Sequence, residues 1–242
     1  MYFEKPGKSN TVETLKAAAA RGQALGLDEI VLASTTGATA YQALEHCPGF
    51  KVTAVTYHCG FREPFQSVLP EDVRADLTSK GVQVVAATHA LSGVERGLSK
   101  KHPGLYPVLL MADTLKLFGQ GTKVAVEVAV MAADAGTFSG RDIIAVGGSS
   151  HGADAALVVK PAHAARIFEL KIREIVSREA SRSNRCQGEV IHNDDTTMKI
   201  LALMQNNHAP DQSERKGIFT TGIVSTLNDQ KIALFYTGRK HA

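Results

Sequence analysis

Four short segments of the sequence combine small, hydroxyl-bearing or titratable residues in patterns that suit ligand binding. The first reads Ser-Thr-Thr-Gly-Ala-Thr and lies directly before a run of helix-forming residues. Backbone N–H groups at a helix N-terminus, together with hydroxyls, can bind an anion such as a phosphate. The same residues can also serve only as a helix cap, and no lysine follows the glycine as it would in a Walker motif. The phosphate hypothesis assigns Ser34, Thr35, Thr36, Gly37, Ala38 and Thr39.

The second segment collects two aromatic side chains, an imidazole, a thiol and a cation between Tyr57 and Arg62. Such a set can stack on a planar ligand, and the imidazole of His58 can transfer protons. The alternatives are an ordinary hydrogen-bonded histidine and, at Cys59, a small buried thiol. The residues assigned to the ligand here are Tyr57, His58, Gly60 and Phe61.

Two further segments place small residues where backbone can approach a ligand closely. Ser92 and Gly93 precede a predicted helix that carries Arg96, although this segment can equally be a solvated helix start. The glycine pair Gly147 and Gly148 joins two strand-like runs and suits either a ligand or a tight turn.

Acid–base chemistry has only isolated candidates in this sequence. Asp134, which follows Met131 by three residues, can neutralise a ligand cation or cap a helix, and both residues are assigned to the ligand. His58 and Asp134 are the two weak catalytic candidates. The sequence lacks HExxH, GxSxG, a Ser-His-Asp spacing and paired carboxylates. It therefore favours binding over catalysis, and we expect no metal.

Continuously apolar runs that alternate with helix-forming segments must position these loops. The pattern predicts strands at 29–33, 52–56, 82–86, 122–130 and 142–146, helices at 14–25, 38–44 and 70–79, and a long crossover through 91–118. Strands without polar alternation are typical of a parallel sheet covered on both faces. The prediction for residues 1–176 is an α/β fold, a three-layer α/β/α sandwich with a mainly parallel, mixed sheet. Ligands bind at the carboxyl ends of such strands, where the four segments fall.

The composition excludes several classes of protein. The chain has 242 residues, of which 44% are apolar and 21% charged, so it is neither disordered nor fibrous. Its three cysteines form no CxxC pair, and no apolar run is long enough to cross a membrane. We expect a cytoplasmic protein without a membrane partner. The net charge of +3 makes a nucleic-acid partner unlikely, and a homo-oligomer stays open.

The character of the sequence changes after residue 176. Residues 177–188 are polar and read as a junction. Beyond it, the pattern predicts strands at 189–192, 217–226 and 231–237 and a helix at 198–204. These elements are few for an independent core.

The first part resembles the stand-alone proteins related to the C-terminal domain of pyruvate kinase. The resemblance rests on blocks in the right order, namely NTVETL (10–15), ASTTGATA (33–40), VTYHCGF (55–61), LSGVER (91–96), MAAD (131–134), VGG (146–148) and GAD (152–154). In pyruvate kinase the loop that matches residues 34–39 takes the phosphate of an allosteric sugar bisphosphate, and the catalytic barrel is a different domain. The resemblance implies the same sandwich and a phosphate-binding loop without pyruvate kinase activity.

Flavin mononucleotide (FMN), or a similar phosphorylated planar molecule, would satisfy both the phosphate loop and the aromatic segment. The leading hypothesis is therefore a binding or regulatory domain for a phosphorylated small molecule. The alternative is a small flavin- or phosphate-ester-dependent enzyme that uses His58 or Asp134.

The second part resembles the start of a bacterial insertion-sequence transposase, of the type that holds metal ions with three carboxylates on an RNase H-like fold. The matching blocks are EVIHNDDT (189–196), KGIFTTG (216–222) and ALFYTGRKHA (233–242). Asp194 matches the first carboxylate, and the sequence ends before the other two. The resemblance implies a truncated fragment, 189–242, without transposition chemistry. An inactive DNA-binding fragment is the third functional hypothesis.

Overall fold

The computed structural model describes residues 1–149, 151–179, 218–227 and 230–239. The chain divides into two compact units, Met1–Arg182 and Ser183–Ala242, and the boundary falls within the predicted 177–188 junction. Within the described part, no helix has the length and apolar character that a membrane span requires.

A seven-stranded sheet forms the centre of the first unit, in the order β1-β7-β6-β5-β2-β3-β4. Its strands are β1 (Tyr2–Phe3), β2 (Glu29–Ala33), β3 (Lys51–Thr56), β4 (Gln83–Ala86), β5 (Ile143–Gly147), β6 (Ala155–Lys160) and β7 (Lys171–Glu179). The four strands β5, β2, β3 and β4 are parallel. β6 is antiparallel to both β5 and β7, and β1 pairs in parallel with β7. The predicted mixed, mainly parallel sheet is confirmed.

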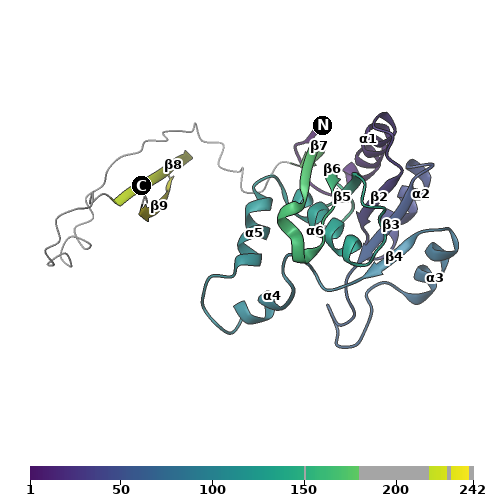
Figure 1. The fold of residues 1–242 in the computed structure, drawn as a ribbon, viewed down its shortest axis with the longest axis horizontal. Helices are drawn as coiled ribbons and strands as arrows, with labels where there is room; N and C mark the ends of the chain where they lie inside the picture. Colours follow the sequence, from purple (N-terminus) through teal and green to yellow (C-terminus); the bar gives the residue numbers. More distant parts are fainter. Residues whose placement is uncertain (150, 180–217, 228–229, 240–242) are drawn as a thin grey trace, which may run out of the picture. The chain divides into compact units, whose positions relative to one another are not determined.

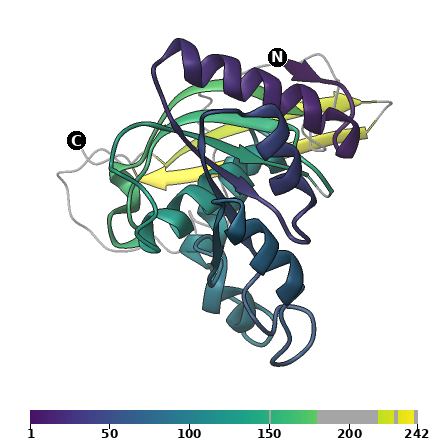
Figure 2. The same cartoon turned by 90° about the vertical axis from the view of Figure 1, so that its right-hand side faces the viewer.

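Helices cover both faces of this sheet (Figure 1). They are α1 (Thr11–Ala24), α2 (Ala38–His46), α3 (Glu71–Ser79), α4 (Gly93–Ser99), α5 (Pro107–Lys116) and α6 (Gln120–Asp134), with short 3-10 turns η1 (Lys8–Asn10) and η2 (Ala164–Glu169). Figure 2 shows the same layers from the side, with α1 outside the sheet.

Alternate residues of one strand enter different cores. Ile30 and Leu32 of β2 pack with α1, α2 and α3, whereas Val31 between them packs with α5 and α6. Successive strand side chains point to opposite faces, so a strand covered on both sides must be apolar throughout. This pattern gives three layers, and the predicted α/β/α sandwich is confirmed.

Residues 122–130, predicted as a strand, form the centre of α6, and that prediction was wrong. Valine alternates with other residues through this segment, which favours a strand on propensity alone. The segment instead packs as a helix against β2, β5 and β6 and is buried around most of its circumference. Its tertiary setting therefore outweighs the local preference.

The carboxyl ends of the four parallel strands lie next to one another. In the ladder, Leu32 stands opposite Val146, Ala33 opposite Val55, and Thr56 opposite Ala86. The chain leaves β2 toward β3 on one side and reaches β5 on the other side only after β4 and α6. This reversal is a topological switch point, where α/β proteins bind their ligands.

The second unit contains two described strands, β8 (Ile218–Leu227) and β9 (Gln230–Arg239), which pair antiparallel. They correspond to the predicted strands at 217–226 and 231–237. The predicted strand at 189–192, the predicted helix at 198–204 and Asp194 lie outside the described residues.

Candidate functional site

The segment from Ser34 to Thr39 connects β2 to α2 at the switch point. The Ser34 hydroxyl accepts a hydrogen bond from the Ala40 amide at 3.2 Å. The Thr56 hydroxyl on the neighbouring strand donates to the Thr35 carbonyl at 3.0 Å. Ser34 therefore does cap the helix, while a bond from β3 holds the loop in place.

The remaining amides of this loop are available to a ligand. Among the hydrogen bonds of the described residues, none uses the N–H of Thr36, Gly37, Ala38 or Thr39. Gly37 has a φ of 91°, and a Cβ there would lie 2.6 Å from Val73 Cγ1, so the turn requires glycine. Free amides at the N-terminus of a nine-residue helix present partial positive charge to an anion.

Four rings from two neighbouring strand ends form a cluster beside this loop, which we call the ring cluster: Tyr57, His58, Phe61 and His89. Tyr57 and Phe61 stack with their centroids 4.0 Å apart. His89 lies 5.0 Å from Phe61, and His58 meets Phe61 edge-on at 5.5 Å. All four side chains are partly exposed, so a planar molecule can reach them.

Arg96 joins the third predicted segment to the ring cluster. Its guanidinium carbon lies 5.6 Å from the centroid of the Phe61 ring, within cation–π range. Gly93, at the start of α4, has a φ of 40°, and Ser92 before it is buried. A ligand can therefore reach the exposed guanidinium of Arg96 but not the buried side chain of Ser92.

His89 was not predicted from the sequence, although it contacts the other three rings. Burial lowers the pKa of His89, and the charges of Lys123, Arg96 and His58 lower it further against the opposing effect of Glu127. We therefore describe His89 as a neutral ring at pH 7. A lone histidine between Thr88 and Ala90 carries no sequence signal for this role.

A buried ion pair on α6 supports the loop that carries His89. Lys123 Nζ lies 2.5 Å from Glu127 Oε2, and both side chains are almost fully buried. Glu127 Oε1 accepts a hydrogen bond from the Leu91 amide at 2.9 Å. The pair therefore ties the loop between β4 and α4 to α6.

Packing explains the two predicted glycines at the end of β5, Gly147 as its last residue and Gly148 directly after it. A Cβ on Gly147 would overlap the Gly121 carbonyl oxygen and lie 2.5 Å from the Ala125 amide nitrogen. A Cβ on Gly148 would overlap the Gly152 carbonyl oxygen. The close approach of α6 and the turn of the loop both need glycine here, with or without a ligand.

Met131 and Asp134 lie elsewhere in the fold. Met131 is buried in the core that α6 forms with one face of the sheet. Asp134 ends that helix, and β5 is the next element along the chain, so Asp134 lies at the amino edge of the parallel strands. There it accepts a hydrogen bond from the Ala164 amide and lies 3.1 Å from His163 Nδ1. Of the two catalytic candidates, only His58 is at the carboxyl edge.

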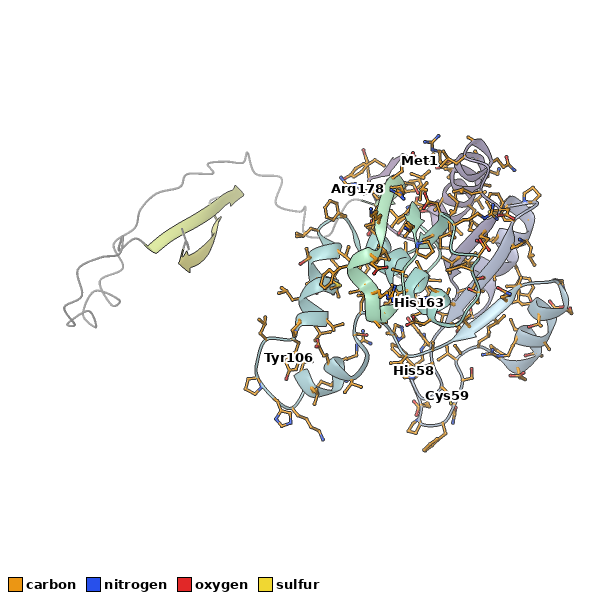
Figure 3. The ribbon with its side chains drawn as sticks, in the orientation of Figure 1. Met1, His58, Cys59, Tyr106, His163 and Arg178 are labelled. Carbon is orange, nitrogen blue, oxygen red and sulfur yellow. The ribbon has the colours of Figure 1, made fainter. Side chains whose placement is uncertain are left out.

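One ring nitrogen of His58 is engaged in a hydrogen bond with the backbone. Its Nδ1 lies 2.7 Å from the Cys59 carbonyl, so Nδ1 donates and Nε2 is left as the basic nitrogen. Figure 3 shows His58 and Cys59 at the end of the unit away from Met1 and Arg178. Within residues 1–149 and 151–179, no three histidine, cysteine or carboxylate side chains group as a metal site would require.

Comparison with protein families agrees with this arrangement. A family model described as "pyruvate kinase, alpha/beta domain" matches residues 13–159. The match contains β2 to β5, the Ser34–Thr39 loop and the ring cluster, and it spans more than half of the chain. The chain therefore belongs to the pyruvate kinase alpha/beta domain family.

Proposed function

We propose that the chain is a binding or regulatory domain for a phosphorylated small molecule. The observation that carries the proposal is the juxtaposition of unused amides at the N-terminus of α2 with the ring cluster at the ends of the next two strands, β3 and β4. One molecule that carries both a phosphate and a planar group would fill the two positions across the ends of β2 and β3.

The phosphate position is supported by backbone dipoles as well as by geometry. The loop amides and the α2 dipole both favour an anion. Thr36 is exposed beside them and offers a hydroxyl. Together these uncharged groups support the proposal of a phosphate-binding cradle at this loop.

The planar position suits an aromatic ligand. Stacked Tyr57 and Phe61 rings offer a flat apolar surface, and Arg96 lies above Phe61 as a cation. FMN combines a phosphate with a large planar ring and is our first probe ligand. The phosphate loop and ring cluster support this choice, and a different phosphorylated planar molecule would use the same two positions.

We expect Thr36→Glu to weaken FMN binding at least about tenfold, because its carboxylate would occupy and repel the phosphate position. Phe61→Ala should weaken FMN by a similar factor through lost stacking, yet leave inorganic phosphate binding unchanged. Calorimetric titration with FMN, riboflavin and inorganic phosphate separates the two effects. Thr114→Glu, an exposed threonine on α5, is the control that adds the same charge away from the loop. Absence of both FMN and phosphate binding in the parent chain would refute the proposal.

We also propose that residues 189–242 derive from a transposase fragment. The sequence blocks that carry this resemblance support it, and the antiparallel pairing of β8 with β9 is compatible with it.

Removal of residues 183–242 should leave the first unit folded, with its unfolding temperature changed by less than about 2 °C. The seven-stranded sheet and the residues of both its cores all lie within Met1–Arg182, so the deletion keeps every one of them. Calorimetry of the full and shortened chains measures this. The same pair of chains tests DNA affinity, which the transposase hypothesis would confine to the longer one. A large drop in unfolding temperature would contradict the two-unit description.

A further inference from the structure

Two buried carboxyl groups meet at the N-terminal end of α6. The Asp154 side chain precedes β6 and is completely buried, and Glu179 at the end of β7 is 2% exposed. A Cβ built on Gly121 would overlap Asp154 Oδ1 and lie 3.0 Å from Glu179 Oε2. These two oxygens therefore face the same turn of the helix. Glu179 follows Arg178, which Figure 3 places beside Met1 and well away from His58.

Each carboxyl group has one oxygen that is held by backbone amides. Asp154 Oδ2 accepts hydrogen bonds from the Gly7 amide at 3.0 Å and the Ser149 amide at 3.2 Å. Glu179 Oε1 accepts from the Gly121 amide at 3.0 Å. The pair thus joins three segments that are distant in sequence: the N-terminal segment, the connection after β5, and the start of α6.

The other oxygen of each group is without a hydrogen bond from the described residues. Asp154 Oδ1 and Glu179 Oε2 are both in this state, as is the hydroxyl of Ser177. Ser177 is fully buried and lies two residues before Glu179 on β7, so it projects from the same face of that strand. Two ionised carboxylates cannot be buried side by side at low cost without a neutralising proton or cation.

The charged side chains on the elements around Asp154 and Glu179 either contact other partners or are exposed to solvent. Lys123 on α6 is paired with Glu127, and Arg178 on β7 lies over the Tyr2 ring. Lys8 and His151, from the N-terminal segment and the connection after β5, are exposed. The α6 N-terminus favours one negative charge, and its Gly121 amide bonds to Glu179. A negative charge in this pair is therefore stabilised on the Glu179 side.

Electrostatics agree with a protonated Asp154. Desolvation by burial raises the pKa of Asp154 to about 6, and the Glu179 charge adds to this against hydrogen bonds from Ser149 and Gly7. We propose that Asp154 and Glu179 share one proton, and that its loss to solvent as the pH rises loosens the junction between the N-terminal segment, α6 and the connection after β5. This inference is independent of the ligand proposed above.

The sign of the pH effect follows from the raised pKa. The folded chain holds the Asp154 proton to about pH 6, whereas the unfolded chain releases it near pH 3.9, to within about one unit. The stabilisation is therefore fully present below the unfolded pKa and is lost as the pH rises through the folded pKa.

The test is an NMR titration of the full chain that follows the amides of Gly7 and Ser149 together with the Asp154 carboxyl carbon. We expect all three signals to titrate together with a midpoint at about pH 6. Asp154→Asn should abolish the amide titration, and Glu179→Gln should lower its midpoint by about one unit or more, since the neighbouring charge is gone. Asp134→Asn, which removes an exposed carboxylate that also accepts an amide bond, is the control and should change nothing.

Three results would overturn the proposal, and the first two need no variant. One is a midpoint below about pH 5 in the parent chain, which would be an ordinary carboxyl group. Another is a midpoint that moves when KCl or MgCl₂ replaces a bulky organic salt, which would show a bound cation in place of the proton. The third is an unchanged midpoint in Glu179→Gln.

Discussion

Gly147→Ala is expected to lower the free energy of unfolding by about 3 kcal/mol, the upper end of what overpacking usually costs. The added methyl group would overlap the Gly121 carbonyl oxygen and press on the Ala125 amide nitrogen, and both are backbone atoms of α6. Backbone cannot move aside as a flexible side chain can. The strain must therefore separate α6 from β5, two elements that hold one of the two cores together.

Urea unfolding measures this loss, and Gly97→Ala is its matched control. Gly97 lies within α4, and a Cβ there would meet no atom within 4 Å. Alanine at this helical position should stabilise by up to about 1 kcal/mol, because glycine is a poor helix former. Equal effects of the two substitutions would show that the close approach at Gly147 is not a constraint.

This result also bears on how the glycine pair is interpreted. Sequence alone left open whether Gly147 and Gly148 admit a ligand or serve a turn. Since packing already accounts for both, a loss of ligand binding in Gly147→Ala would not identify a ligand contact. Substitutions in the Ser34–Thr39 loop are the informative ones, because the amides there are unused.

Most of the fold was predictable because buried parallel strands are apolar without interruption. The run from Glu29 to Ala33 predicted β2 at its observed bounds, and the hydroxyl-rich segment after it predicted the start of α2 at Ala38. α6 could not be predicted in this way, since its valines favour a strand. Its helical signal was the spacing of Lys123 and Glu127, which places the two charges one turn apart.

The candidate site was predictable only where chemistry and position coincide in sequence. The Tyr57–Phe61 segment follows a strand directly, so its rings could be assigned to the edge of the sheet. His89 reaches the same cluster because the loop between β4 and α4 folds back over α6, and a path of this kind leaves no local pattern. Asp134 shows the reverse error, in which a suggestive residue type lies at the opposite edge of the sheet.

The second large effect concerns the buried ion pair of Lys123 and Glu127, which holds the loop between β4 and α4. Glu127→Leu should destabilise the chain by about 3–5 kcal/mol, because it leaves the Lys123 ammonium buried without its partner. It also deprives the Leu91 amide of its acceptor. Urea unfolding of the variant gives the stability, and the NMR signals of His89 should broaden or shift as the loop is released.

Replacing both members of the ion pair separates the cost of the unpaired Lys123 charge from the cost of the unsatisfied Leu91 amide. Lys123→Met together with Glu127→Leu removes both charges at similar volume, and replacing an entire buried ion pair by apolar groups is often close to neutral. The double variant should recover most of the loss and retain about 1–3 kcal/mol from the unsatisfied Leu91 amide. If the double variant is as unstable as Glu127→Leu, the ammonium is not the source of the penalty. Measuring Lys123→Met alone completes a double-mutant cycle, and its coupling energy reports how far α6 depends on charge neutrality to hold the His89 loop.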